Sequence, residues 1–414
     1  MTASALGRIR TSLCVLLALL VCTGVLLAQP EAAPAASVNA ARSLLARGAR
    51  EQAVHMLNEL IRRNPRDGEA RLLLGMVLDE SGRSGEAVAP LMEAVRLLPA
   101  SAEAHNALGE AFNNLNALGP ARGEFEKAVQ LDPGMAKAHL NLGMVLAQTD
   151  DLARAAEHLD RALAMLGGTP EAALAHYLRA KVHTDLSEVA QASTDLKEAV
   201  RLKPDFAEAW SDLGQARKTL QDDAGALAAF KRAVMLSPSD PVALTRLGAE
   251  YLSQGQVRPA ILYLRKAYRI DPKDQTTLNS LQTALRQDGQ MEEARKVKEK
   301  LVEVLRARDI ATQNQLNATL INNEGAALEK AGDLRSALDK YRAAVELDPR
   351  QVELRVNYAI ALLRLGQWKP GLAQLREAMR QRPDDTVLKA AWDDAIRQAP
   401  PGSWTAEDER APRP

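Results

Sequence analysis

The fold of this chain is decided by residues 207–272, which read AEAWSDLGQARKTLQDDAGALAAFKRAVMLSPSD followed by PVALTRLGAEYLSQGQVRPAILYLRKAYRIDP. The two blocks repeat one pattern of apolar, small and proline residues. In the first block the pattern is Trp210, Leu213, Gly214, Ala226, Phe230, Ala233 and Pro238, and in the second it is Leu244, Leu247, Gly248, Tyr251, Ala260, Leu264, Ala267 and Pro272. A period of about 34 residues indicates stacked helical hairpins.

The same pattern extends in both directions from this stretch. When the closing proline is numbered 32, ten repeats begin at Pro34, Gly68, Ala102, Ala136, Ala173, Ala207, Pro241, Gln275, Ala318 and Val352. Position 8 is small in nine of them, namely Ala41, Gly75, Gly109, Gly143, Ala180, Gly214, Gly248, Gly325 and Ala359, and is Gln282 in the eighth. Position 20 is Ala53, Ala87, Ala121, Ala155, Ala192, Ala226, Ala260, Ala294, Ala337 and finally Gly371.

Small residues at positions 8 and 20 have a physical reason. Two antiparallel helices whose axes are about 8–10 Å apart need small side chains where they cross. Positions 4, 7, 11 and 24 are mostly large and apolar and have the spacing of a helical face. The proline ends the second helix. Each repeat is therefore predicted to be a helix, a turn and a second helix, and the chain to be all-α.

These residues resemble the tetratricopeptide repeat, whose Trp, Leu-Gly, Tyr, Ala, Phe, Ala and Pro pattern the sixth and seventh repeats follow. The resemblance covers residues 34–385. It implies an α-solenoid, a right-handed superhelix of helix-turn-helix repeats that binds partner proteins. Position 2, 5, 9, 12 and 13 side chains of each first helix are then expected to line its concave groove.

Composition shifts and breaks in the period predict the domain organisation. We expect a signal peptide at 1–28, a flexible lead at 29–36, repeats 1–8 at 37–306, an extended helix and joint at 307–317, repeats 9–10 at 318–385, a capping helix at 386–398 and a disordered tail at 399–414. The eighth repeat spans 43 residues before Ala318. Its stretch Met291–Ile310 contains no Gly or Pro and predicts one long helix, with Thr312–Asn317 as a polar joint.

The leader predicts export. Arg8 and Arg10 precede an uncharged run with an apolar centre at residues 13–27, and Ala28 offers a cleavage site. The protein is thus expected to be periplasmic or secreted. An uncleaved membrane anchor is the alternative, because the run is borderline in length for spanning a bilayer. Lipidation at Cys22 is a further reading, which Val21 disfavours.

Composition excludes several classes of function. Cys14 and Cys22 both lie in the leader, so the cleaved product could form no disulfide or thiolate metal site. The chain has 53 basic and 53 acidic residues and 3% aromatic residues, which gives no footprint for nucleic acid. No small-molecule substrate or cofactor is expected.

Catalytic and metal sites are not expected either. His105, His139 and His176 occupy position 4 of three successive repeats, but stacked repeats hold equivalent positions about 10 Å apart, too far to share a zinc ion. We interpret them as packing rings that replace Trp. No phosphate loop, His-Glu-x-x-His or Gly-x-Ser-x-Gly motif is present. The protein is predicted not to be an enzyme.

The groove positions of the resemblance give the candidate partner-binding residues, a mixed apolar, amide and basic set. They are Leu72, Met76, Asn106, Asn113, Leu140, Met144, Tyr177, Lys181, Lys218, Arg286, Asn322 and Arg364. Amides can bond a peptide backbone, and Met and Leu accept varied side chains. Some family members clamp a partner's terminal carboxylate, but no three consecutive repeats here supply that set of Lys, Asn and Arg.

The function expected from the sequence is an exported, non-catalytic scaffold that binds proteins or extended peptides in the groove. The alternative is a fixed structural component of an envelope assembly, such as a polysaccharide export or secretion machine. An enzyme with an unrecognised site is a third reading, which requires a deep pocket with converging titratable groups.

Overall fold

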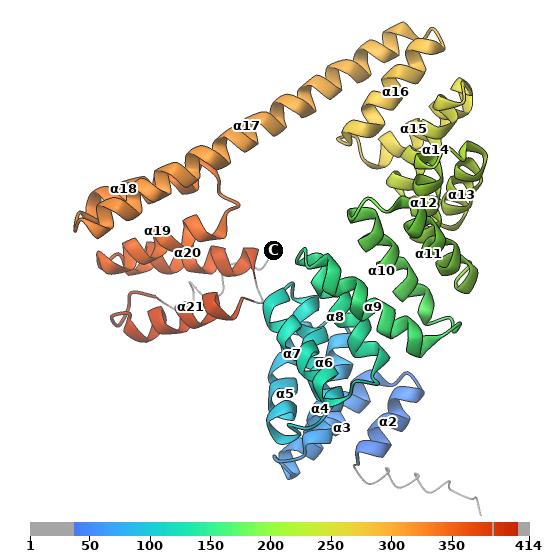
Figure 1. Cartoon of the computed structure of the whole chain (residues 1–414). Coiled ribbons are helices and arrows are strands. Elements are labelled where there is room, and N and C mark those ends of the chain that lie inside the picture. The colour runs from blue at the N-terminus through green and yellow to red at the C-terminus, as the bar shows by residue number, and fades with distance from the viewer. Residues whose placement is uncertain (1–36, 383–384, 405–414) are drawn as a thin grey trace, which may run out of the picture. The chain divides into compact units, whose positions relative to one another are not determined.

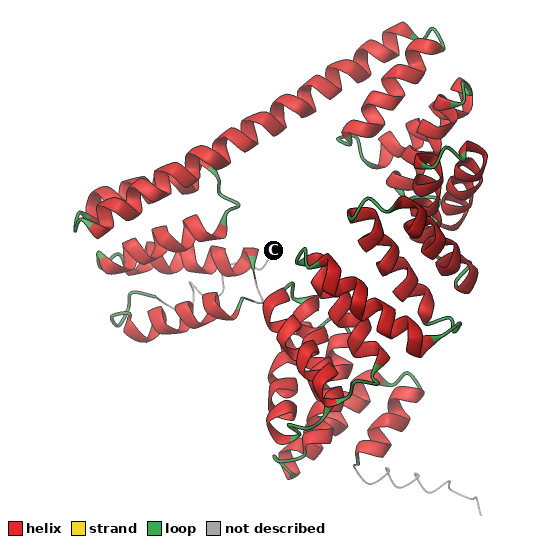
Figure 2. Cartoon of the chain, viewed as in Figure 1, coloured by secondary structure: helices red, strands yellow, loops and turns green. Residues whose placement is uncertain are grey.

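The computed structural model describes residues 37–382 and 385–404, and within them every regular element is a helix (Figures 1 and 2). The helices are α2 (Val38–Ala46), α3 (Arg50–Arg63), α4 (Gly68–Glu80), α5 (Ser84–Leu97), α6 (Ala102–Asn114), α7 (Leu118–Leu131), α8 (Ala136–Gln148), α9 (Leu152–Leu166), α10 (Ala172–Asp185), α11 (Val189–Leu202), α12 (Ala207–Thr219), α13 (Asp223–Leu236), α14 (Pro241–Ser253), α15 (Val257–Ile270), α16 (Gln275–Gln287), α17 (Met291–Lys330), α18 (Leu334–Leu347), α19 (Val352–Arg364), α20 (Trp368–Gln381) and α21 (Thr386–Gln398). The predicted signal peptide and flexible lead lie outside the described residues.

The chain divides into two compact parts, Met1–Val145 and Leu146–Pro414. In each part the helices pack chiefly as hairpins, such as α4 with α5 and α12 with α13, and each hairpin packs on the next. The all-α repeat fold predicted from the sequence is confirmed.

Close packing inside each hairpin depends on the small residue at position 8. A Cβ atom added to Gly214 would lie 2.6 Å from the Phe230 ring, and one added to Gly109 would lie 2.6 Å from the Phe125 ring. Both rings occupy position 24 and are almost completely buried. The sequence predicts that the position 8 residue meets position 20 where the helices cross. In the structure, the large side chain at position 24 lies directly on the glycine. The position 20 alanines are buried beside it.

A left-handed residue joins the two helices in each of the ten predicted repeats, always at position 15. Six of these residues are glycines, including Gly48 (φ 75°) and Gly255 (φ 73°). The other four are Asn116, Asp150, Ser187 and Gln221, with φ between 57° and 63°. A left-handed residue ends the first helix in the way a C-terminal glycine does, and it lets the chain reverse in a few residues.

The long helix α17 is the main departure from the period. It runs for 40 residues, so that its first half pairs with α16 and its second half with α18. The polar stretch Thr312–Asn317, expected to act as a joint, lies inside this helix without a break. No Gly or Pro interrupts residues 291–324, and hence nothing in the backbone favours ending the helix there.

The C-terminal end is closed by α21. Its Leu388 packs with Val352 and Ala378, and its Ala395 packs with Leu372 and Leu375. The packed structure continues beyond Gln398, into the segment where the sequence predicted a disordered tail. Trp404 lies edge-on to Trp392 with ring centroids 5.4 Å apart, and the Arg376 guanidinium covers the Trp404 ring. An aromatic ring can thus hold a proline-rich tail against the last hairpin.

Candidate protein-binding face

The candidate face consists of position 2, 5, 9, 12 and 13 side chains on the first helix of each repeat. In the part that ends at Val145 these helices are α2, α4, α6 and most of α8, and in the following part they are α10, α12, α14, α16, the second half of α17, and α19.

In the N-terminal part, two of the six candidates serve the stacking of repeats. Leu72 is buried, and Asn106 is only 2% exposed. The Asn106 amide oxygen accepts a hydrogen bond from Asn141 Nδ2 at 3.0 Å. Asn141 Nδ2 also donates to Glu110 at 2.9 Å, and Lys137 forms an ion pair with the same carboxylate at 2.8 Å. These polar groups are therefore occupied between neighbouring repeats.

The other four candidates in this part remain accessible. Met76, Leu140 and Met144 are half-buried, so that each presents part of an apolar side chain. Asn113 is also half-buried, and its amide oxygen is buried without a hydrogen-bond partner. This combination leaves flexible apolar surface beside an amide whose acceptor is unsatisfied.

In the C-terminal part, most candidate polar groups bond to an adjacent repeat. The Tyr177 hydroxyl donates to Asp212 at 3.2 Å, and Asn357 donates to Asn322 at 3.0 Å. Burial, followed by the nearby Asp212 carboxylate, raises the pKa of Tyr177, so the phenol remains a donor. Arg364 pairs with Glu329. The Lys218 ammonium lies 2.7 Å from Glu250.

Two basic candidates are left available. Lys181 is exposed and lies 5.9 Å from the centroid of the Tyr177 ring, a contact that leaves its ammonium open to solvent. Arg286 is exposed, and no described residue forms a hydrogen bond or ion pair with its guanidinium. The C-terminal part thus offers cations, whereas the N-terminal part offers Met, Leu and an amide.

Sequence reasoning missed the regular polar links between position 5 of one repeat and position 6 of the next. Asn141 to Asn106, Tyr177 to Asp212, and Asn357 to Asn322 each join residues 35 apart. Arg246 extends the second link, because its guanidinium donates to Ser211 and Asp212. A signal was present in the sequence, since an amide or charge at position 5 or 6 recurs one period later. Its meaning depends on how the helices stack.

The position 4 histidines have a structural role that is more specific than packing. The Nε2 atoms of His105 and His139 lie 3.4 and 3.2 Å from the carbonyl oxygens of Pro99 and Pro133, six residues earlier. Trp210 Nε1 makes the same bond to Pro204 at 3.0 Å. Position 4 therefore favours a ring with an N–H group, which explains why His can replace Trp there.

His176 belongs to a buried charge cluster. Its Nδ1 atom lies 2.8 Å from Asp195, a residue only 3% exposed, and Arg179 binds the same carboxylate through two nitrogens. Burial by itself would raise the pKa of Asp195, but the hydrogen bonds from His176 and Arg179 outweigh it and hold the pKa below its usual value. The cluster links α10 to α11.

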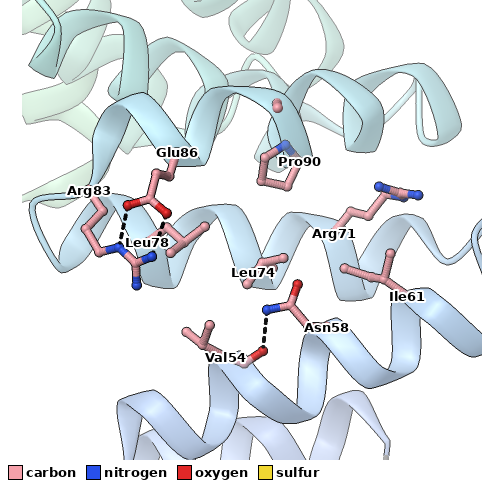
Figure 3. Close-up of a pocket in the computed structure, with 10 residues that line it drawn as sticks. Val54, Asn58, Ile61, Arg71, Leu74, Leu78, Arg83, Glu86 and Pro90 are labelled. Atoms are coloured by element: carbon pink, nitrogen blue, oxygen red, sulfur yellow. Dashed lines mark hydrogen bonds and ion pairs between the residues drawn. The ribbon is translucent and has the colours of Figure 1, made fainter. Parts of the chain in front are cut away.

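Besides an open trough along α17, the described residues contain two smaller cavities. One, of about 360 Å³, lies between α3, α4 and α5 (Figure 3). Leu74, Leu78 and Pro90 line its apolar part, and Arg83 is bonded to Glu86 at one end. A second cavity, of about 200 Å³, is lined by residues of α14 and α16 and of the turn before α16, including Thr245 and Asp274.

Neither cavity gathers free titratable groups. Within the described part of the chain, no set of three His, Cys, Asp or Glu side chains is placed to hold a metal ion. Arg83 is paired with Glu86 in the first cavity, and Asp274 accepts hydrogen bonds from Thr277 beside the second.

Solved structures with a similar fold include the PilF protein of Pseudomonas aeruginosa, which is 20% identical over 52% of this chain and 98% of its own, with a TM-score of 0.48. PilW, described as a type IV pilus biogenesis factor, is 20% identical over 53% of this chain and 98% of its own, with a TM-score of 0.47. YrrB, described as having an unusual peptide-binding site, is 22% identical over 46% of this chain and 96% of its own, with a TM-score of 0.39.

No curated protein sequence matches the chain. Family models described as tetratricopeptide repeat match residues 38–102, 91–136, 120–173, 140–192 and 177–241, then 242–274, and then 328–391. These segments together span most of the chain and follow the hairpins described above. The chain therefore belongs to the tetratricopeptide repeat family.

Proposed function

We propose that this protein is an exported, non-catalytic scaffold that binds partner proteins or extended peptides through the candidate face. Proteins of the tetratricopeptide repeat family mediate protein–protein interactions. The observation that carries the proposal is the accessible set Met76, Asn113, Leu140 and Met144 in the N-terminal part.

These four side chains suit an extended segment. Methionine side chains adapt to partners of varied shape, and an amide can bond a peptide backbone. The scaffold would use Lys181 and Arg286 for acidic groups of the same or another partner.

Export rests on the leader pattern of residues 1–28, with the periplasm or the extracellular space as the destination. Retention by the leader as a membrane anchor is the alternative. Within the described residues, no helix combines the length and apolar character that a membrane span needs. A permanent place in an envelope assembly is the second candidate function, and it is favoured if the protein sediments with membranes.

The test is site-specific photo-crosslinking in intact cells. A photoreactive residue at Met76 or Leu140 is expected to capture a discrete partner. The matched control is the same residue at Met92, which is 55% exposed on the second helix of the same repeat as Met76. Capture that is equal at Met76 and Met92 would contradict the proposal. Fractionation of the crosslinked species then separates a free scaffold from a fixed envelope component.

A further inference from the structure

The beginning of the ninth repeat exposes a face that other repeats bury. Position 3 is Ala70, Ala104, Ala138, Ala175, Ala209, Ala243, Thr277 and Leu354 in the second to eighth and tenth repeats, and each is at most 2% exposed. In the ninth repeat this position is Leu320, which is 62% exposed. The same is true of position 10, because Ala327 is exposed whereas the equivalent residues of the second to eighth and tenth repeats are buried.

The cause of this exposure is the straight course of α17. Position 3 is normally covered by positions 27 and 28 of the preceding repeat, as Leu354 is by Ala344 and Val345. The preceding position 28 for Leu320 is Val302, which lies on the same helix and points to the same side. Val302 and Leu320 are 18 residues apart, which is about five turns of an α-helix. Because the helix is straight, Val302 cannot cover Leu320 of the same chain.

We propose that two copies of this chain pair through α17, antiparallel and about a two-fold axis near residue 311. In that arrangement Val302 of each copy covers Leu320 of the other. The end of the eighth repeat then receives the ninth repeat of the second copy as its next neighbour. A two-fold contact requires that both copies present the same surface. Val302 and Leu320 meet this requirement, because residues about five turns apart lie on the same side of a helix.

Two further observations support a second copy as the occupant. A shallow trough of about 660 Å³ follows α17 from Arg295 to Ile310 and includes Val302, and the exposed side chain of Leu316 lies four residues before Leu320 on the same side of the helix. The same alignment sets Lys298, which is exposed, near Glu324, whose carboxylate already forms an ion pair with Lys340 of its own chain at 2.6 Å. In this chain position 3 packs with positions 27 and 28 of another repeat, as Ala209 does with Ala199 and Val200.

The experiment measures the mass of the full chain, as recovered from cells, by size-exclusion chromatography with light scattering. The wild-type protein is expected to be a dimer. Val302→Glu and Leu320→Arg are each expected to weaken dimerisation by about tenfold or more, because each places an unpaired charge at the centre of the contact. Met235→Glu, at a side chain 68% exposed on α13, is the control and should remain dimeric.

Mixing the two variants makes the test specific for the antiparallel register. A heterodimer of Val302→Glu with Leu320→Arg contains one Glu–Arg pair and one unaltered Val–Leu pair, so the mixture should recover a dimer that neither variant forms alone. Circular dichroism should show the same helix content for all variants, since Leu320 is exposed and Val302 is only half-buried in a single chain. A monomeric wild-type protein, dimeric single variants, or a mixture that stays monomeric would each overturn the proposal.

Discussion

The Lys218 ammonium lies 2.7 Å from a carboxylate of Glu250, a residue with no exposed surface. Glu250 occupies position 10 of its repeat, where the other repeats from the second to the tenth carry Ala or Val. Lys218 reaches it from the preceding repeat, and Gln254 donates a second hydrogen bond at 2.8 Å. A charge pair thus replaces an apolar contact at one of the stacking positions.

Replacing Lys218 with Ala should lower the free energy of unfolding by about 2–3 kcal/mol, since it leaves a buried carboxylate without its counter-charge. Glu250→Val should cost less, because it removes the buried charge and Lys218 can still reach water. Chemical denaturation of both variants checks this order, with Lys181→Ala as a surface control. Equal losses for Lys218→Ala and Lys181→Ala would refute the argument.

Acid should weaken the α10–α11 hairpin through Asp195. Its pKa is lower in the folded chain than in the unfolded chain, so the carboxylate stabilises the fold fully above its unfolded value of about 3.9. This contribution is lost as the pH falls through the folded pKa. Asp195→Asn should therefore be less stable than wild type at pH 7, and the gap should close in acid. Unfolding curves between pH 7 and about pH 2 test this, and a gap that widens in acid would contradict it.

The turn residue Gln221 offers a stabilising substitution. Its φ of 61° is unfavourable for a side chain with a Cβ atom, whereas glycine adopts it freely. Gln221→Gly should raise the free energy of unfolding by up to about 1 kcal/mol. This is the net gain, because the greater entropy of glycine in the unfolded chain opposes the relief of the left-handed strain. The reverse change, Gly255→Gln at φ 73°, should destabilise. Thermal unfolding of both variants measures the two signs.

Adding a Cβ atom at Gly214 should destabilise the hairpin, because Gly214 lies against the Phe230 ring. Gly214→Ala places a Cβ atom 2.6 Å from the buried ring and should cost about 1–3 kcal/mol. Gly119→Ala is the matched control, because a Cβ atom there meets no atom within 4 Å. If the two variants had similar free energies of unfolding, the two helices could move apart without loss of stability, and the prediction would be wrong.

The hairpins could be predicted from the sequence because positions 8, 20 and 32 act locally, within one pair of helices. The left-handed turns at Asn116, Asp150, Ser187 and Gln221 could not, since these residue types do not by themselves require positive φ. The course of α17 was predicted only for its first half. A helix continues through Thr312–Asn317 because its polar residues have no helix-breaking chemistry.

The candidate face was the least predictable feature. Five residues at groove positions bind a neighbouring repeat through their polar groups, namely Asn106, Tyr177, Lys218, Asn322 and Arg364. A position number identifies the side of a helix, and the burial of a side chain depends on what the next repeat contributes. Met76, Asn113 and Arg286 remain accessible for that reason.

Because α17 is one continuous helix, its length sets the direction in which the ninth and tenth repeats face. Adding or removing one residue between Arg306 and Leu316 would turn everything that follows by about 100° and shift it by about 1.5 Å along the axis. The ninth and tenth repeats would then face a different direction without any change in their own packing. Viable length variants of this helix are therefore expected to differ by near-integral numbers of turns, such as 7, 11 or 18 residues, each of which restores the original direction to within about 20°.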